Sequence, residues 1–224
     1  KLTMKTQTQI KHSQPPYQYI IDMAKRVPVI AIMGSGAKTI TAILISLALE
    51  QQGRQVRLCN LDRKATIPLR LLESESPDLI VVNCPAYLPE DTKVIAACSQ
   101  VAAAAKINLV TIGDKDHHLA YAFNLLMEMT RLPNAASCYH YIFIEVENLK
   151  QDIPQGGQID ENRVREELDV LTDLKGCTRV KFEQLDSIKL TEGIKQNIQY
   201  WVDQEPIATA IAPYKLTIQK LLAL

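Results

Sequence analysis

A glycine-rich segment near the N-terminal end of the chain carries the residue types that bind phosphate groups. Residues 34–39 read GSGAKT and lie between a short apolar run and a long stretch rich in Leu, Ile and Ala. Glycines let successive backbone N–H groups point at one anion, and a helix that follows adds the positive end of its dipole. A lysine and a hydroxyl reach the outer phosphates and Mg²⁺. The segment therefore predicts a nucleotide phosphate site made of Gly34, Ser35, Gly36, Ala37, Lys38, Thr39 and Thr41.

Two features of this segment depart from the usual phosphate-binding loop. The position before Lys38 normally holds glycine, and Ala37 adds a Cβ there; a positive φ at Ala37 would cost on the order of 1 kcal/mol. Ile32 replaces the first glycine of the GxxxxGK[ST] pattern. A plain strand-to-helix turn is the alternative interpretation. The order of strand, loop, helix, Gly53, strand and Asp62 favours the phosphate loop.

The flanking residues predict the elements that must position this loop. Residues 27–33 form a β-branched apolar run, which is typical of a strand buried on both faces of a parallel sheet. Residues 38–52 predict a helix that ends at Gly53. Further strands are predicted at 55–61, 78–83, 107–113, 139–147 and 178–185, and further helices at 89–105, 117–131, 160–174 with Asp160 as N-cap, 189–203 and 208–223.

This alternation predicts a three-layer, doubly wound α/β domain over residues 27–224, with a mainly parallel sheet and helices on both faces. Residues 1–26 predict an N-terminal arm that is partly disordered or carries a short helix at 17–26. Ligands bind beyond the carboxyl ends of the strands in such sheets. We therefore expect residues 34–39, 60–63, 83–88 and 113–118 to share one rim.

The composition is that of an ordinary globular protein and excludes several other classes. Hydrophobic residues make up 47% and charged residues 22%, and the net charge is zero, so the whole molecule has no general attraction to nucleic acid or anionic lipid. The five cysteines form no CxxC pair, which favours reduced thiols in a cytoplasmic protein over a disulfide framework or a zinc site. No apolar run approaches the roughly 20 residues of a transmembrane helix.

From residue 27 onward the sequence resembles the ParA/MinD family of deviant-Walker ATPases, which position plasmids, division proteins and other cargo. The segment MGSGAKT is similar to the family's KGGVGKT loop, NLDRKAT (60–66) to its D-x-D turn, and VVNCPAYLPEDT (81–92) to a strand that ends in D-(T/C)-P-P. The tail EPIATAIAPYKLTIQKLL (205–222) is similar to the closing helix of the family.

The resemblance implies ATP or ADP with Mg²⁺ as cofactor. It also implies a homodimer that binds a partner protein or non-specific DNA. Carried over by position, Lys38 binds the phosphates, Thr39 and Asn83 belong to the Mg²⁺ site, and Asp62 is the catalytic carboxylate that orients the attacking water.

Four departures from the family pattern fall on this chemistry. Met33 stands where the family has a lysine that reaches the partner's phosphates, and Asn83 stands at the Walker B aspartate. Asn60 replaces the first aspartate of the D-x-D turn, and Ala37 replaces a glycine. Met33 carries no charge, and Asn83 accepts a hydrogen bond without neutralising a cation. Because phosphoryl transfer depends on positioning and charge stabilisation, we predict very slow or absent hydrolysis.

Three functions follow from these observations. The first is a degenerate ParA/MinD-like protein in plasmid partition, conjugation or cargo positioning, which acts through a partner or DNA without turnover. The second is an active ATP-dependent dimer switch with slow hydrolysis. The third is a P-loop biosynthetic enzyme, for which no substrate-binding pattern is present.

Other chemistry-bearing residues favour structural roles. A metal site at Asp114, Asp116, His117 and His118 is less expected than helix capping, and Cys84 is expected to be a buried thiol rather than a nucleophile. We expect the final helix to dock on the core rather than on a membrane. Basic residues in the second half alternate with acidic ones and predict a mixed solvated face; they are Lys150, Arg163, Arg165, Lys175, Arg179 and Lys181.

Overall fold

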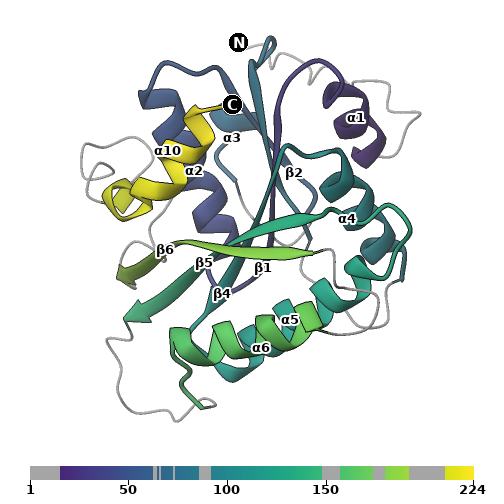
Figure 1. Ribbon diagram of the computed structural model, residues 1–224. Helices are drawn as coiled ribbons and strands as arrows, with labels where there is room; N and C mark the ends of the chain where they lie inside the picture. Colours follow the sequence, from purple (N-terminus) through teal and green to yellow (C-terminus); the bar gives the residue numbers. More distant parts are fainter. Residues whose placement is uncertain are drawn as a thin grey trace, which may run out of the picture.

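The computed structural model describes residues 16–62, 65, 67–72, 74–85, 92–147, 157–173, 180–191 and 210–224. Within these ranges six strands form one sheet in the order β2-β3-β1-β4-β5-β6, and every neighbouring pair is parallel (Figure 1). The strands are β1 (Val29–Ser35), β2 (Val56–Asn60), β3 (Leu79–Asn83), β4 (Ile107–Gly113), β5 (Cys138–Glu147) and β6 (Lys181–Thr191). The predicted parallel sheet is confirmed.

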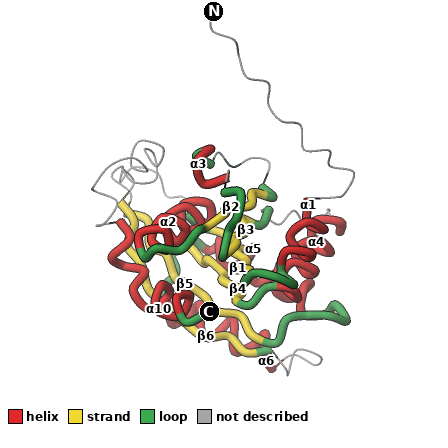
Figure 2. Tube along the Cα trace, turned by 90° about the horizontal axis from the view of Figure 1, so that it is seen from above, coloured by secondary structure: helices red, strands yellow, loops and turns green. Residues whose placement is uncertain are grey.

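Helices cover both faces of the sheet, which confirms the three-layer prediction. Helices α1, α4, α5 and α6 pack on one face, and α2, α3 and α10 pack on the other (Figures 1 and 2). Their bounds are α1 (Pro16–Met23), α2 (Lys38–Gln51), α3 (Leu69–Leu72), α4 (Thr92–Ala104), α5 (Asp116–Thr130), α6 (Glu161–Asp173) and α10 (Lys215–Leu222), with a 3₁₀ turn η1 (Ala212–Tyr214) before α10. None of the helices among these residues has the length and apolar character to span a bilayer.

Strand β1 shows why the run before the loop is apolar throughout. Val29, Ala31 and Met33 face the layer that contains α4 and α5, whereas Ile30 and Ile32 face α2. Because successive side chains point to opposite faces and both faces are covered, neither set reaches water. The loop after β1 therefore begins from a strand that is fixed by packing on both of its faces.

The end of the chain departs from the sequence prediction. Strand β6 runs to Thr191, so the helix expected over 189–203 is wrong for its first residues, and its remainder lies outside the described residues. The reason is tertiary: β6 pairs with β5 as far as Thr191, and Ile188 and Leu190 are buried beneath α2 and α10. The short helix α3 was not predicted. The arm prediction for residues 1–15 falls outside the described part, whereas the helix expected at 17–26 corresponds to α1.

Helix α10 begins on a carboxylate that comes from β6. Asp186 is buried and accepts hydrogen bonds from the Thr217 backbone N–H at 2.8 Å, the Thr217 hydroxyl at 2.5 Å and the Leu216 N–H at 3.3 Å. Tyr214, at the N-cap position, makes no side-chain cap of its own. Asp186 therefore satisfies the first N–H groups and the positive dipole end of α10 across the fold. By contrast, α6 has the local cap that was predicted, because Asp160 accepts from the Arg163 N–H at 3.0 Å.

We predict that Thr217→Val lowers the free energy of unfolding by about 1–3 kcal/mol, because it leaves a buried carboxylate without one charge-assisted hydrogen bond. Urea unfolding followed by circular dichroism measures the change. Thr172→Val is the matched control, since the Thr172 hydroxyl bonds only to the Leu168 carbonyl of its own helix in the described structure. An equal loss in both variants would contradict the capping role of Asp186.

Candidate functional site

The loop between β1 and α2 has a left-handed backbone at three positions. The φ angles are 98° at Gly34, 87° at Gly36 and 51° at Ala37. Glycine adopts these angles freely, whereas alanine does so at a cost on the order of 1 kcal/mol. Ala37 is also the N-cap residue of α2 and provides no side-chain cap, so the loop carries the first N–H groups of a long helix.

The two loop glycines let the chain lie directly on β4. A Cβ at Gly34 would overlap the Thr111 carbonyl oxygen, and a Cβ at Gly36 would lie 2.6 Å from the Gly113 Cα. The His118 ring lies next to Gly113, where it leaves no room for a side chain. Any residue larger than glycine at these positions would therefore displace the loop from the sheet.

Lys38 extends from the start of α2 to the ends of two neighbouring strands. Only 7% of its surface is exposed, and its Nζ lies 2.9 Å from Asp62 Oδ2, just after β2. The same ammonium donates to the carbonyl of Cys84, just after β3. The structure thus brings the predicted phosphate lysine and the predicted catalytic carboxylate into contact. The Cys84 carbonyl was not predicted, because a backbone acceptor leaves no trace in residue types.

A chain of amide hydrogen bonds runs beside Thr39. The Asp62 N–H donates to Asn60 Oδ1 at 3.1 Å, and Asn83 Nδ2 donates to the same oxygen at 2.9 Å. Asn83 Nδ2 also donates to the Thr39 hydroxyl at 3.3 Å. Because Asn60 Oδ1 accepts from both sides, it fixes the orientation of the Asn83 amide, which presents its donor to Thr39. Asn83 Oδ1 is buried and makes no hydrogen bond to any described residue.

Two further residues near the loop are buried rather than open to it. Thr41 is fully buried, and its hydroxyl lies 3.2 Å from the hydroxyl of Tyr214, whose pKa burial raises. The nucleotide-binding role of Thr41 stays a prediction. A hydrogen bond with the Cys98 thiol and burial raise the pKa of Cys84, so Cys84 is a neutral buried thiol, as expected, and not a nucleophile.

Of the remaining predicted residues, His118 lies against the loop, because a Cβ at Gly36 would be 3.2 Å from its Nδ1. His117 and His118 have ring centroids 4.2 Å apart, and Asp116 pairs with Arg163 at 2.5 Å. The N-cap of α5 is Lys115, which makes no side-chain cap, and Asp114 is buried with its carboxylate 3.6 Å from the Lys115 ammonium. Lys150, Lys175, Arg179, Arg63 and residues 86–88 lie outside the described part.

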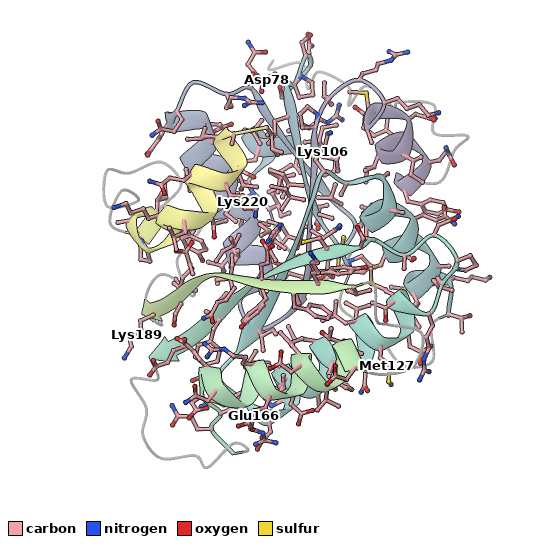
Figure 3. All side chains as sticks on the ribbon, viewed as in Figure 1. Asp78, Lys106, Met127, Glu166, Lys189 and Lys220 are labelled. Carbon is pink, nitrogen blue, oxygen red and sulfur yellow. The ribbon has the colours of Figure 1, made fainter. Side chains whose placement is uncertain are left out.

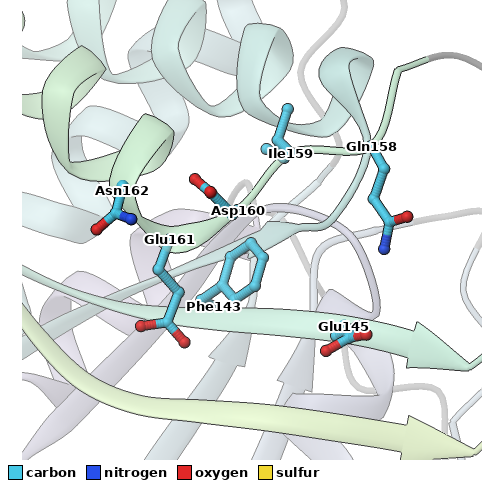
Figure 4. A pocket seen from close by; sticks show the side chains of 7 residues that line it. All are labelled: Phe143, Glu145, Gln158, Ile159, Asp160, Glu161 and Asn162. Atoms are coloured by element: carbon cyan, nitrogen blue, oxygen red, sulfur yellow. The ribbon is translucent and has the colours of Figure 1, made fainter.

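A cleft opens beside the carboxyl end of β5, where the chain enters α6 (Figure 4). It has a volume of about 420 Å³ and is lined by Phe143 and Glu145 of β5 and by residues 158–162. Glu145, Asp160 and Glu161 place carboxylates around it, so the cleft does not suit a phosphate. The loop between β1 and α2, with its helix N-terminus and Lys38, suits an anion better than this cleft does.

The parallel sheet, the two helical layers and the glycine-containing loop between β1 and α2 define a three-layer α/β fold of the P-loop NTPase-like type. Solved structures similar to it are a chain of the MinC:MinD cell division complex of Aquifex aeolicus (13% identity, 88% of this chain and 97% of that chain covered, TM-score 0.56) and apo McdA of Cyanothece (12% identity, 88% and 98% covered, TM-score 0.53). MinD of Pyrococcus horikoshii complexed with Mg-ADP is also similar (10% identity, 87% and 95% covered, TM-score 0.51). The chain therefore has a ParA/MinD-like fold. No protein-family model and no curated protein matches the sequence.

We predict that Ala37→Gly raises the free energy of unfolding by up to about 1 kcal/mol, because glycine removes the left-handed strain at this residue. Ala96→Gly, at an exposed position of α4, is the matched control and should lower the same free energy by about 0.5–1 kcal/mol. Urea unfolding of both variants gives the two signs. Similar destabilisation in both would contradict strain at Ala37.

Proposed function

We propose that this chain is a ParA/MinD-like positioning protein with a degenerate nucleotide site. It acts as a cytoplasmic homodimer through a partner protein or non-specific DNA, in plasmid partition, conjugation or the positioning of another cargo. It binds nucleotide weakly through the loop amides and Lys38 and hydrolyses it very slowly or not at all. The observation that carries this proposal is the amide pair Asn60–Asn83 beside Thr39.

The residues present fit a phosphate better than they fit Mg²⁺. Three left-handed loop residues, a helix N-terminus and the Lys38 ammonium are all suited to an anion. Mg²⁺ instead prefers oxygen ligands and a nearby carboxylate. Asn83 presents an N–H to Thr39, and its amide can turn over only by placing its oxygen against Asn60 Oδ1. This supports loose or absent Mg²⁺ coordination at Thr39 and Asn83.

The ion pair between Lys38 and Asp62 supports a site in which these two side chains bind each other rather than a ligand. Their ion pair must open before Lys38 can reach a phosphate and before Asp62 can orient a water molecule. Because both groups are largely buried, breaking this ion pair takes place in poorly solvated surroundings and costs free energy. Nucleotide affinity is reduced by the cost of that separation.

Met33 supports a site that lacks the lysine one protomer would provide to the other. By the resemblance, Met33 stands where the family has a lysine that reaches the partner's phosphates. Here its side chain is fully buried in the apolar layer of α4 and α5. A side chain packed in the core reaches no second nucleotide.

One alternative keeps specific support. Lys38, Thr39 and Asp62 all remain at the rim, and a relative in fold was solved as MinD with Mg-ADP. An ATP-dependent dimer switch with slow hydrolysis would use these three residues. A P-loop biosynthetic enzyme is the further alternative, with no feature of the described residues in its favour.

Titration calorimetry with ATP and ADP, with and without Mg²⁺, tests the proposal alongside phosphate release over hours. We expect weak binding that changes little with Mg²⁺, and no turnover. Tight, Mg²⁺-dependent ATP binding with phosphate release would establish the switch instead. Absence of heat for both nucleotides at millimolar concentration would remove nucleotide from the function altogether.

We predict that Lys38→Met abolishes the nucleotide binding that the wild-type chain shows, because it removes the buried ammonium at the end of the loop while it keeps the stem of the side chain. Lys25→Met, in the exposed turn just after α1, is the matched control and should leave affinity unchanged. An unchanged affinity in Lys38→Met would place the nucleotide elsewhere on the chain.

We predict that Asn83→Asp makes nucleotide affinity Mg²⁺-dependent, with about a tenfold gain on adding Mg²⁺, because a carboxylate beside Thr39 supplies the missing charge. The same titrations measure the gain. Asn124→Asp, exposed on α5, adds the same charge away from the loop and should show none. No response to Mg²⁺ in Asn83→Asp would mean that the amide is not the defect.

A further inference from the structure

A second set of chemistry-bearing side chains lies near the amino ends of β5 and β6, away from the phosphate loop. Cys138, His140 and Glu183 each offer one ligand atom, and these atoms all lie within 4.8 Å of one another. His140 Nε2 is 3.9 Å from Cys138 Sγ, and His140 Nδ1 is 3.2 Å from Glu183 Oε2. Nothing in the proposed nucleotide site involves these residues.

The geometry of the sheet explains why the three side chains meet. Cys138 and His140 are two residues apart on β5, so they point to the same face. Glu183 is the register partner of His140 on the parallel strand β6. Tyr139 and Tyr141 point to the opposite face, into the layer of α5 and α6. The cluster therefore faces the α2 and α10 side, under α10.

His140 is nearly buried, and one of its ring nitrogens has no hydrogen-bond partner among the described residues. His140 is 6% exposed, and its Nδ1 lies 3.2 Å from Glu183 Oε2 but makes no hydrogen bond within the described part of the chain. A buried ring nitrogen in this state costs free energy unless a partner is supplied. Cys138 and Glu183 are more open, so a solute can reach the cluster from outside.

We propose that Cys138, His140 and Glu183 form a binding site for a zinc-type divalent transition ion. Thiolate, imidazole and carboxylate are the ligands that Zn²⁺ takes, whereas Mg²⁺ and Ca²⁺ prefer oxygen alone. Zinc bonds of about 2.0–2.3 Å place neighbouring ligand atoms roughly 3.3–3.8 Å apart. The three ligand atoms, one from each residue, all lie within 4.8 Å of one another, so a small side-chain movement brings them to one ion. Three protein ligands leave a fourth position for water.

Lys220 is the internal competitor of this ion. It projects from α10 (labelled in Figure 3), and its ammonium lies 3.1 Å from Glu183 Oε2. A divalent cation on Glu183 would replace that ammonium, which is partly exposed and free to turn into solvent. Metal binding therefore replaces the ion pair between Glu183 of β6 and Lys220 of α10 by bonds from the ion to residues of β5 and β6.

Zinc titration calorimetry and Co²⁺ absorption of the full, reduced chain test this site. We expect one bound ion per chain and, with Co²⁺, a thiolate-to-metal charge-transfer band. Cys138→Ser should remove the band, and both Cys138→Ser and Glu183→Gln should weaken Zn²⁺ binding by at least about tenfold. Lys220→Ala should strengthen binding by about tenfold, because it removes a competing positive charge.

Cys59→Ser is the matched control, since Cys59 is a half-buried free thiol on β2 whose pKa burial raises to about 11. It should leave the band and the affinity unchanged. Circular dichroism shows that each variant is folded, and Lys220→Ala tests the site through a gain that misfolding does not produce. No cobalt band in the wild type, unchanged Zn²⁺ affinity in Cys138→Ser, or weaker binding in Lys220→Ala would each overturn the proposal. Nucleotide titrations are independent of these outcomes.

Discussion

A buried ammonium that needs partners holds the rim of this sheet together. Lys38 is almost without solvent, and an unpaired charge in such a place would cost several kcal/mol. Its two partners come from the segments that follow β2 and β3, so one side chain ties the first long helix to two neighbouring strand ends. The loop, the turn after β2 and the chain after β3 are therefore positioned by one charge rather than by three local turns.

The neutral side chains around this ion pair are also connected. Asn60 and Asn83 are register partners on adjacent parallel strands, and their amides bond to each other where a pair of carboxylates would repel. Two bonded amides form a pair that is stable without a cation. Under the proposed function, the same two side chains leave Thr39 without the charge that Mg²⁺ requires, so the stability of the resting site and slow or absent hydrolysis have one cause.

The sequence predicted what depends on neighbours along the chain. The apolar run of β1, the stop at Gly53 and the local cap at Asp160 are encoded within a few residues, and the structure has all three. It could not predict the continuation of β6 to Thr191, because residues 189–191 acquire their state from pairing with β5.

The contacts that the sequence did not predict involve residues far apart in the chain or backbone groups. Asp186 caps a helix that begins 29 residues later, and Cys84 contributes a carbonyl rather than its thiol. Cys138 and His140 form a visible C-x-H pattern, yet Glu183 joins them only through the register of two strands. Distant pairing and backbone groups carry no local pattern, which is why these parts of the site emerge only in three dimensions.

The contact between Thr41 and Tyr214 makes the packing of α2 depend on a residue that is synthesised late. Thr41 lies in the first turns of α2, and the residue that meets it is 173 positions later in the chain. Leu221 and Tyr214 also close the apolar surface between α2 and the sheet. On the ribosome, the part of α2 that Tyr214 and Leu221 cover therefore remains exposed until residues 210–224 have been made.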